Sequence, residues 1–105
     1  MTNQDKISAI QAVRDKLYNE DIYYKLLEDM GDSKINYRDY MTSDLINCDI
    51  ELERLEEADY ELCTALFTML LREDHFCNGS LCKRYESGQL DAVLCKMIKE
   101  LETTF

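Results

Sequence analysis

The stretch YELCTALFTMLLREDHF, residues 60–76, decides the fold of this chain. Its apolar side chains fall on nearly every side of a helix rather than along one stripe, which is typical of a helix buried on several sides. They are Leu62, Cys63, Ala65, Leu66, Phe67, Met69, Leu70 and Leu71. The sequence therefore predicts a buried central helix over about 60–76, against which the remainder of the chain packs.

Two further helices are expected after this one. Asn78-Gly79 marks the end of the central helix, because glycine adopts the left-handed conformation of a helix end without steric cost. A short helix follows and is closed by Gly88. The last helix, about 89–102, is amphipathic, with apolar residues at helical spacing. These are Leu90, Val93, Leu94, Met97, Ile98 and Leu101.

Residues 1–31 have the pattern of a helical hairpin. The first helix is expected from Asn3 to Tyr18, and the second begins at the capping residue Asn19 and ends at Gly31. The inner face of the first helix is expected to hold Ile7, Ile10, Val13 and Leu17.

The whole chain is expected to be all-α. Its 105 residues suit one domain, and the absence of proline together with only three glycines removes most of the turns that a β fold needs. We predict a compact single-domain bundle of about five to six helices. It comprises the hairpin at 1–31, an acidic connection with irregular or short-helix structure at 32–58, and a helical core at 59–105.

The charge balance restricts the possible partners. Lys and Arg number 12 against 22 Asp and Glu, so the net charge of −10 repels nucleic acid and anionic membrane surfaces and favours a basic protein partner. The sequence has no long apolar run and no signal-peptide pattern, which predicts a cytoplasmic protein. Its five cysteines are then expected to be reduced.

Most of the negative charge is concentrated in residues 44–61, which hold a net charge of −7. The carboxylates are Asp44, Asp49, Glu51, Glu53, Glu56, Glu57, Asp59 and Glu61, with Arg54 as the one base. As a single helix this segment would be about 27 Å long, with about one net charge per 4 Å, close to the spacing of about 3.4 Å between DNA phosphates. We therefore take these eight carboxylates as the candidate partner-binding residues. The alternative is an acidic segment that is simply solvated.

The histidine and some of the cysteines are candidates for a metal site or a catalytic site. His75, Cys77 and Cys82 could bind zinc together with Cys63 or Cys95, but the chain lacks a paired CxxC and cysteine is a common core residue. An acidic domain also disfavours a thiolate nucleophile with His75 as its base. We expect no enzyme activity, no cofactor and no metal.

The run from Arg72 to Phe76 is expected to be structural. Arg72 would pair with a carboxylate across the following turn, and Phe76 would fill the end of the core. Gly79 would then turn the chain.

From about Leu55 onward the sequence resembles a family of short bacterial and phage proteins of unknown function. The segment ALFTMLLREDHFCNGSLCKRYESGQLDAVLCKMIKEL, residues 65–101, is similar to its pattern ALxTxxxRxExFxxG followed by a short helix and an amphipathic helix. The matching positions are Ala65, Leu66, Thr68, Arg72, Asp74, Phe76, Gly79 and Gly88. The resemblance implies an all-helical fold over about 55–102 and brings no activity, cofactor or catalytic residue.

Together these features predict a non-enzymatic, acidic protein-binding module. The specific hypothesis is an anti-CRISPR-like inhibitor from a phage or mobile element, which imitates nucleic acid and occupies a basic protein such as a nuclease effector. Two alternatives remain open: a bacterial accessory protein that forms a homodimer through a surplus apolar face of its last helix, and a Cys/His metal or redox protein.

Overall fold

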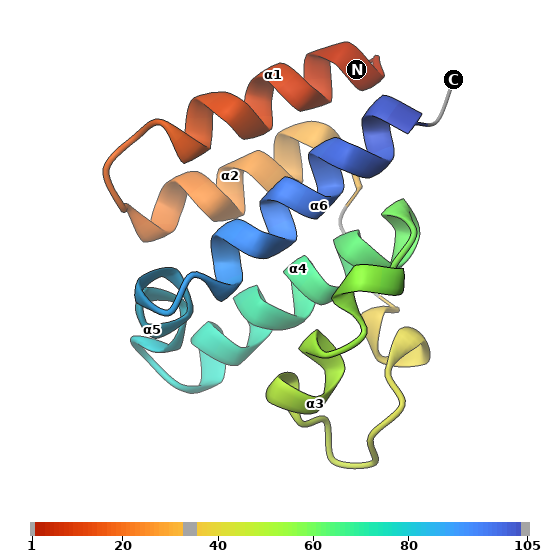
Figure 1. Cartoon of the computed structure of the whole chain (residues 1–105). Helices are drawn as coiled ribbons and strands as arrows, with labels where there is room; N and C mark the ends of the chain where they lie inside the picture. The colour runs from red at the N-terminus through yellow and green to blue at the C-terminus, as the bar shows by residue number, and fades with distance from the viewer. Residues whose placement is uncertain (1, 33–35, 104–105) are drawn as a thin grey trace.

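The computed structural model describes residues 2–32 and 36–103, and within them the chain forms six α-helices, two 3₁₀ turns and no strand (Figure 1). The elements are α1 (Asn3–Arg14), α2 (Glu20–Met30), η1 (Tyr37–Tyr40), α3 (Cys48–Leu52), η2 (Leu55–Glu57), α4 (Tyr60–Phe76), α5 (Ser80–Glu86) and α6 (Gln89–Thr103). This confirms the predicted all-α bundle. No helix in the described residues is long and apolar enough to cross a membrane.

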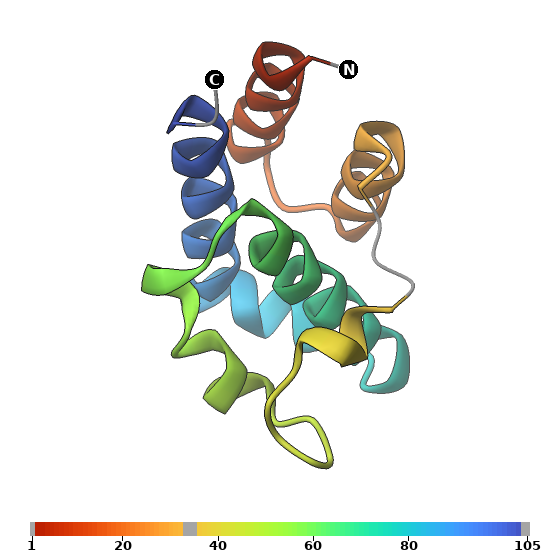
Figure 2. The same cartoon turned by 90° about the vertical axis from the view of Figure 1, so that its right-hand side faces the viewer.

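Helix α4 lies at the centre of the bundle, as its sequence predicted. The helices α1, α2 and α6 lie around one side of it, while η1 and α3 lie on the other (Figures 1 and 2). Every residue from Cys63 to Leu71 is buried, and Leu66, Phe67 and Leu70 have no exposed surface. The Asp59 side chain caps the helix by accepting a hydrogen bond of 2.8 Å from the Leu62 amide. The bounds 60–76 are confirmed.

Helix α6 buries its whole apolar stripe inside the chain. All six residues expected on its inner face are buried against α1 and α4. Its exposed positions are Ala92, Lys99, Glu102 and Thr103. The homodimer hypothesis therefore loses the surplus apolar face on which it rested.

The N-terminal hairpin agrees with the prediction in α2 and differs in α1. The Asn19 side chain accepts from the Asp21 amide at 2.9 Å, and Gly31 ends α2 with φ +71°. Helix α1, however, ends at Arg14, so the expectation that it continues to Tyr18 was wrong. The chain must leave the helix axis there to reach α2, which leaves Leu17 91% exposed instead of buried.

Two carboxylates fix the helices at points far apart in the sequence. Asp91 on α6 accepts from the Arg14 guanidinium at 2.7 and 3.2 Å and so joins α6 to α1. Asp74, buried at the end of α4, accepts from the Leu81 amide at 3.0 Å and from the Tyr24 hydroxyl at 3.2 Å. The bonds to Asp74 satisfy a buried carboxylate, so they specify the packing without the penalty of an unsatisfied group, whereas the Arg14–Asp91 pair is exposed.

The connection between α2 and α4 contains only short elements. η1, α3 and η2 are short, as expected for a connection with irregular or short-helix structure at 32–58, of which residues 33–35 lie outside the described residues. Residues 44–61 form α3, η2 and the start of α4. The candidate acidic segment is thus not one rod-like helix, and the spacing of one net charge per 4 Å along a single axis does not occur.

Candidate binding site

The acidic segment is held in place by one buried carboxylate, Glu51, on α3. Glu51 has no exposed surface. One oxygen accepts from the Thr42 amide at 3.0 Å, and the other accepts from the Ser43 amide at 2.8 Å and from the Ser43 hydroxyl. The Arg54 guanidinium donates to Glu51 at 2.9 Å and to the Tyr40 carbonyl at 2.7 Å. Burial contradicts the prediction that Glu51 contacts a partner, because its oxygens are already used inside the fold.

The hydrogen bonds around Glu51 determine its protonation. Burial alone raises the pKa of a carboxyl group, since it penalises the charged form. The donors from Ser43, Thr42 and Arg54 outweigh that effect and lower the pKa of Glu51 from 4.5 to about 2. Glu51 is therefore ionised at neutral pH and acts as the anchor for the 42–43 backbone.

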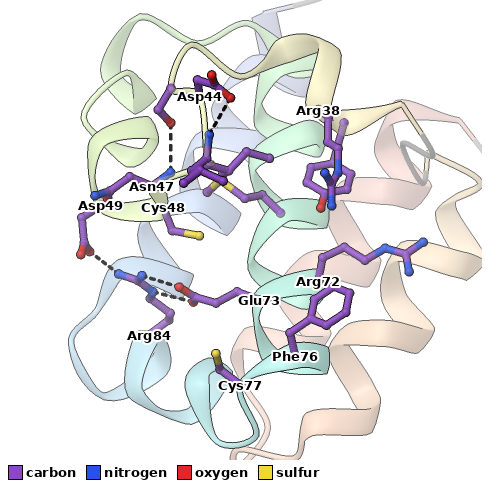
Figure 3. A pocket seen from close by; sticks show the side chains of 15 residues that line it. Arg38, Asp44, Asn47, Cys48, Asp49, Arg72, Glu73, Phe76, Cys77 and Arg84 are labelled. Carbon is purple, nitrogen blue, oxygen red and sulfur yellow. Dashed lines mark hydrogen bonds and ion pairs between the residues drawn. The ribbon is translucent and has the colours of Figure 1, made fainter.

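A second polar link joins α3 to the end of the bundle. Arg84 on α5 binds Glu73 on α4 through two hydrogen bonds of 3.0 and 2.8 Å, and it also donates to Asp49 (Figure 3). This arrangement raises the pKa of Arg84, and the Arg84 guanidinium lowers the pKa of both carboxyl groups. Asp49 is exposed, yet its charge is already compensated within the chain.

The remaining predicted carboxylates point outward. Glu53, Glu56 and Glu57 are exposed, and none of their side chains forms an ion pair or hydrogen bond with another described residue. Asp44 is exposed and accepts from the Leu45 amide, and Asp59 is exposed as the cap of α4. Glu61 is exposed and accepts from the Tyr40 hydroxyl at 3.5 Å. Six of the eight candidate carboxylates therefore remain accessible to a partner.

A groove of about 780 Å³ opens beside this segment, between η1 with the 43–49 loop and the second half of α4 with Arg84 of α5 (Figure 3). This volume falls within the range of about 300–1,000 Å³ that is usual for binding clefts. Met69 contributes to its lining from the core. Arg38 lines the groove from η1, whereas Arg72 and Phe76 line it from α4, across from Asp44 and Asp49 (Figure 3).

Two structural expectations for this wall were wrong. The Arg72 side chain forms no ion pair or hydrogen bond within residues 2–32 and 36–103, so it does not anchor to a carboxylate across the turn. Phe76 is 75% exposed and does not fill the end of the core. Helix α4 ends at Phe76, and the chain reverses at Gly79, with φ +93°, so the Phe76 ring stays outside the core. At this end of α4 the fully buried residue is Leu81.

Leu45 on the opposite rim has an unusual conformation. It is 91% exposed and has φ +55°, the one positive φ of a residue other than glycine in the described part of the chain. A left-handed conformation costs an L-residue with a Cβ roughly 1–2 kcal/mol. Neither the strain nor the exposure of a leucine stabilises the fold, so folding alone does not explain this residue.

The candidate chemical residues do not gather into a site. His75 and Cys77 are exposed and Cys82 is half-buried, and the described residues contain no group of three His, Cys, Asp or Glu side chains that could hold a metal ion. Burial raises the pKa of the Cys48 and Cys63 thiols to about 12. A hydrogen bond to Glu86 raises the pKa of Cys82. Protonated thiols are poor nucleophiles and poor ligands.

Comparison with known families gives one match. Residues 8–103 match a family described as "Family of unknown function (DUF6508)". The chain belongs to this family. The match begins at residue 8, so it also covers the amino-terminal half, which the resemblance from about Leu55 onward had left out. No curated protein and no solved structure matches the chain.

Sequence reasoning missed the groove and the role of Glu51. Nothing in the local pattern distinguishes Glu51 from Glu53, because both lie in the same acidic run and only the fold brings Thr42 and Ser43 to one of them. A weak signal was present in Leu45 and Ile46, two apolar residues placed between Asp44 and Asn47 outside any amphipathic pattern.

Proposed function

We propose that this protein is a non-enzymatic binding module, whose outward carboxylates on residues 44–61 engage a basic surface of another protein. The observation that carries the proposal is the distribution of cations. Arg54 forms an ion pair with Glu51, and Arg84 forms ion pairs with Asp49 and Glu73, so both arginines are neutralised within the fold. Within residues 2–32 and 36–103, the exposed side chains of Glu53, Glu56 and Glu57 have no compensating charge, and a basic partner supplies it.

The class of partner follows from that charge. Complementary potentials speed association and exclude wrong partners, and nucleic-acid-binding proteins carry strongly basic grooves. We propose that the partner is such a protein, a nuclease of a bacterial defence system being the specific case, and that binding inhibits it. The support for mimicry is the local charge of the segment and not a helical rod, since the segment consists of short elements.

The proposal is tested by reversing three of the outward charges. The variant with Glu53→Lys, Glu56→Lys and Glu57→Lys keeps the fold, because these side chains are exposed and make no described contact. Immobilised wild-type protein should capture a basic partner from extracts of its source cells, and the triple variant should lose it. Captured partner should elute with salt, since exposed charges are screened over about 8–10 Å at physiological ionic strength.

A matched control distinguishes the effect of this surface from the effect of the protein's net charge. Asp15→Lys, Glu28→Lys and Glu102→Lys change the total charge equally, at exposed positions directly after α1, on α2 and on α6. The control should retain the partner. Equal capture by both triple variants, or equal loss, contradicts the proposed surface. Displacement of the partner by short duplex DNA or RNA tests the mimicry, and its absence would leave a basic partner that is not engaged at its nucleic-acid site.

A further inference from the structure

The groove beside α4 contains two arginines that the chain does not neutralise. Arg14, Arg54 and Arg84 each bind a carboxylate, at 2.7, 2.9 and 2.8 Å. Arg38 and Arg72 are exposed and bind no carboxylate of the described residues. The Arg38 guanidinium lies over the Tyr37 ring, 5.9 Å from its centroid. In a chain with 22 carboxylates and 12 Lys and Arg, two arginines without a carboxylate partner among the described residues are unexpected. Both line the same groove (Figure 3).

Apolar side chains stand directly beside these charges. Phe76 follows Arg72 by one helical turn and therefore shares its face of α4. Leu45 stands on the opposite rim and is held there at the cost of a left-handed backbone. Single exposed apolar residues are ordinary, but two that line one groove, one of them strained, resemble the anchors of an interface.

The guanidinium groups define the chemistry of the occupant. Arginine presents a planar set of donors that matches a carboxylate, and it stacks well beside aromatic rings. A polyanion is a poor occupant, because the chain carries a net charge of −10 and because Asp44 and Asp49 line the other wall. A single carboxylate flanked by apolar side chains matches both the two arginines and the apolar rims.

We infer that this groove binds a short extended segment of another protein, in which an Asp or Glu faces Arg38 and Arg72 and a neighbouring apolar side chain packs against Phe76 and Leu45. Glu53, Glu56 and Glu57 of the proposed function do not line this groove, although Asp44 does. The groove takes a ligand of opposite charge, so the protein would join an acidic, apolar segment in the groove to a basic surface on the adjoining carboxylates.

The test is selection from a library of random octapeptides on the wild-type protein at physiological salt. Selected peptides should be enriched in Asp or Glu within two residues of Leu, Ile or Phe. In fluorescence anisotropy, replacing that acidic residue by its amide should weaken binding by about tenfold, as expected for loss of a charge-assisted hydrogen bond. A selection without acidic residues, or without any enrichment, overturns the inference.

Protein variants locate the site. The double variant Arg38→Gln and Arg72→Gln should bind the selected peptide about tenfold more weakly than wild type, and Phe76→Ser should also bind it more weakly. The control Lys16→Gln and Lys99→Gln removes two positive charges at exposed positions outside the groove and should bind the peptide within about twofold of wild type.

Two outcomes overturn the inference. Equal losses of peptide affinity in both double variants indicate an effect of net charge alone, and full displacement of the peptide by excess inorganic phosphate indicates a site for any anion. The Glu53, Glu56 and Glu57 reversal should leave peptide binding intact, so this test is independent of the proposed function.

Discussion

Helix α4 is stabilised mainly by apolar burial, whereas the connection at 36–59 is stabilised by a few hydrogen bonds and ion pairs. Residues Cys63–Leu71 of α4 are all buried, and most of them are apolar. The connection has only short elements, and its order depends on the Glu51 carboxylate and on the Arg84 link. The first region loses stability in proportion to lost volume and apolar area, whereas the second depends on the presence of individual charges.

The difference explains where a binding surface can arise. The segment Cys63–Leu71 of α4 is buried throughout and leaves no exposed side chain for a partner. A connection fixed at two internal points can leave its other residues exposed, so Asp44, Leu45 and Glu53 are free of a role in the core. The predictions below test this contrast, beginning with the largest expected effect.

Removing volume from α4 should have the largest effect. Leu66→Ala should lower the free energy of unfolding by about 2–5 kcal/mol, because Leu66 is fully buried and the cavity cannot collapse completely. Leu17→Ala is the matched control, since Leu17 is 91% exposed, and should change it by no more than about 0.5 kcal/mol. Urea unfolding measures both, and similar losses would mean that α4 is not the centre of the core.

Acid should weaken the connection before it affects α4. The pKa of Glu51 is lower in the folded chain, about 2, than its ordinary value of 4.5, so its contribution is complete above pH 4.5 and is lost as the pH falls towards 2. The contribution amounts to about 3 kcal/mol at neutral pH. The protection factors of the Thr42 and Ser43 amides in hydrogen exchange, taken relative to the intrinsic rate at each pH, should fall across this pH window more than those of amides in α4.

The variant Glu51→Gln is the control for the acid effect. It lacks the titrating group, so exchange at Thr42 and Ser43 should already be fast at neutral pH and should show no further loss of protection specific to this window. An unchanged profile in the variant would assign the acid sensitivity to other carboxylates.

Breaking the Arg84 link should have an intermediate effect. Arg84→Gln should cost about 1–3 kcal/mol, because the partly buried guanidinium donates to both Glu73 and Asp49 and charged hydrogen bonds are of this size. Arg38→Gln removes an arginine that has no carboxylate partner among the described residues and should cost no more than about 0.5 kcal/mol. Thermal unfolding compares them, and equal costs contradict the structural role of Arg84.

Relieving the strain at Leu45 should have the smallest effect and the opposite sign. Asn tolerates a left-handed backbone better than leucine, so Leu45→Asn should raise the free energy of unfolding by up to about 1 kcal/mol. The same variant should bind the selected octapeptide more weakly than wild type. A stability gain without loss of peptide binding would remove Leu45 from the proposed groove.

The sequence by itself determined the helices whose signals are local. Helix α4 followed from an apolar run, α6 from a regular stripe, and the ends of α2 from Asn19 and Gly31. In each case residues within one or two turns contain the information, because helical periodicity and capping act over that distance.

Only the tertiary structure decided which polar and apolar side chains are exposed. Glu51 is buried because the Thr42 and Ser43 backbone comes to it, while Glu53, two residues later, is exposed. Leu17 and Phe76 fit their helical patterns and are nevertheless exposed, because the chain turns before either reaches the core. Burial depends on partners distant in sequence, so the pattern that located the acidic segment could not show which of its carboxylates anchors the fold and which six remain accessible.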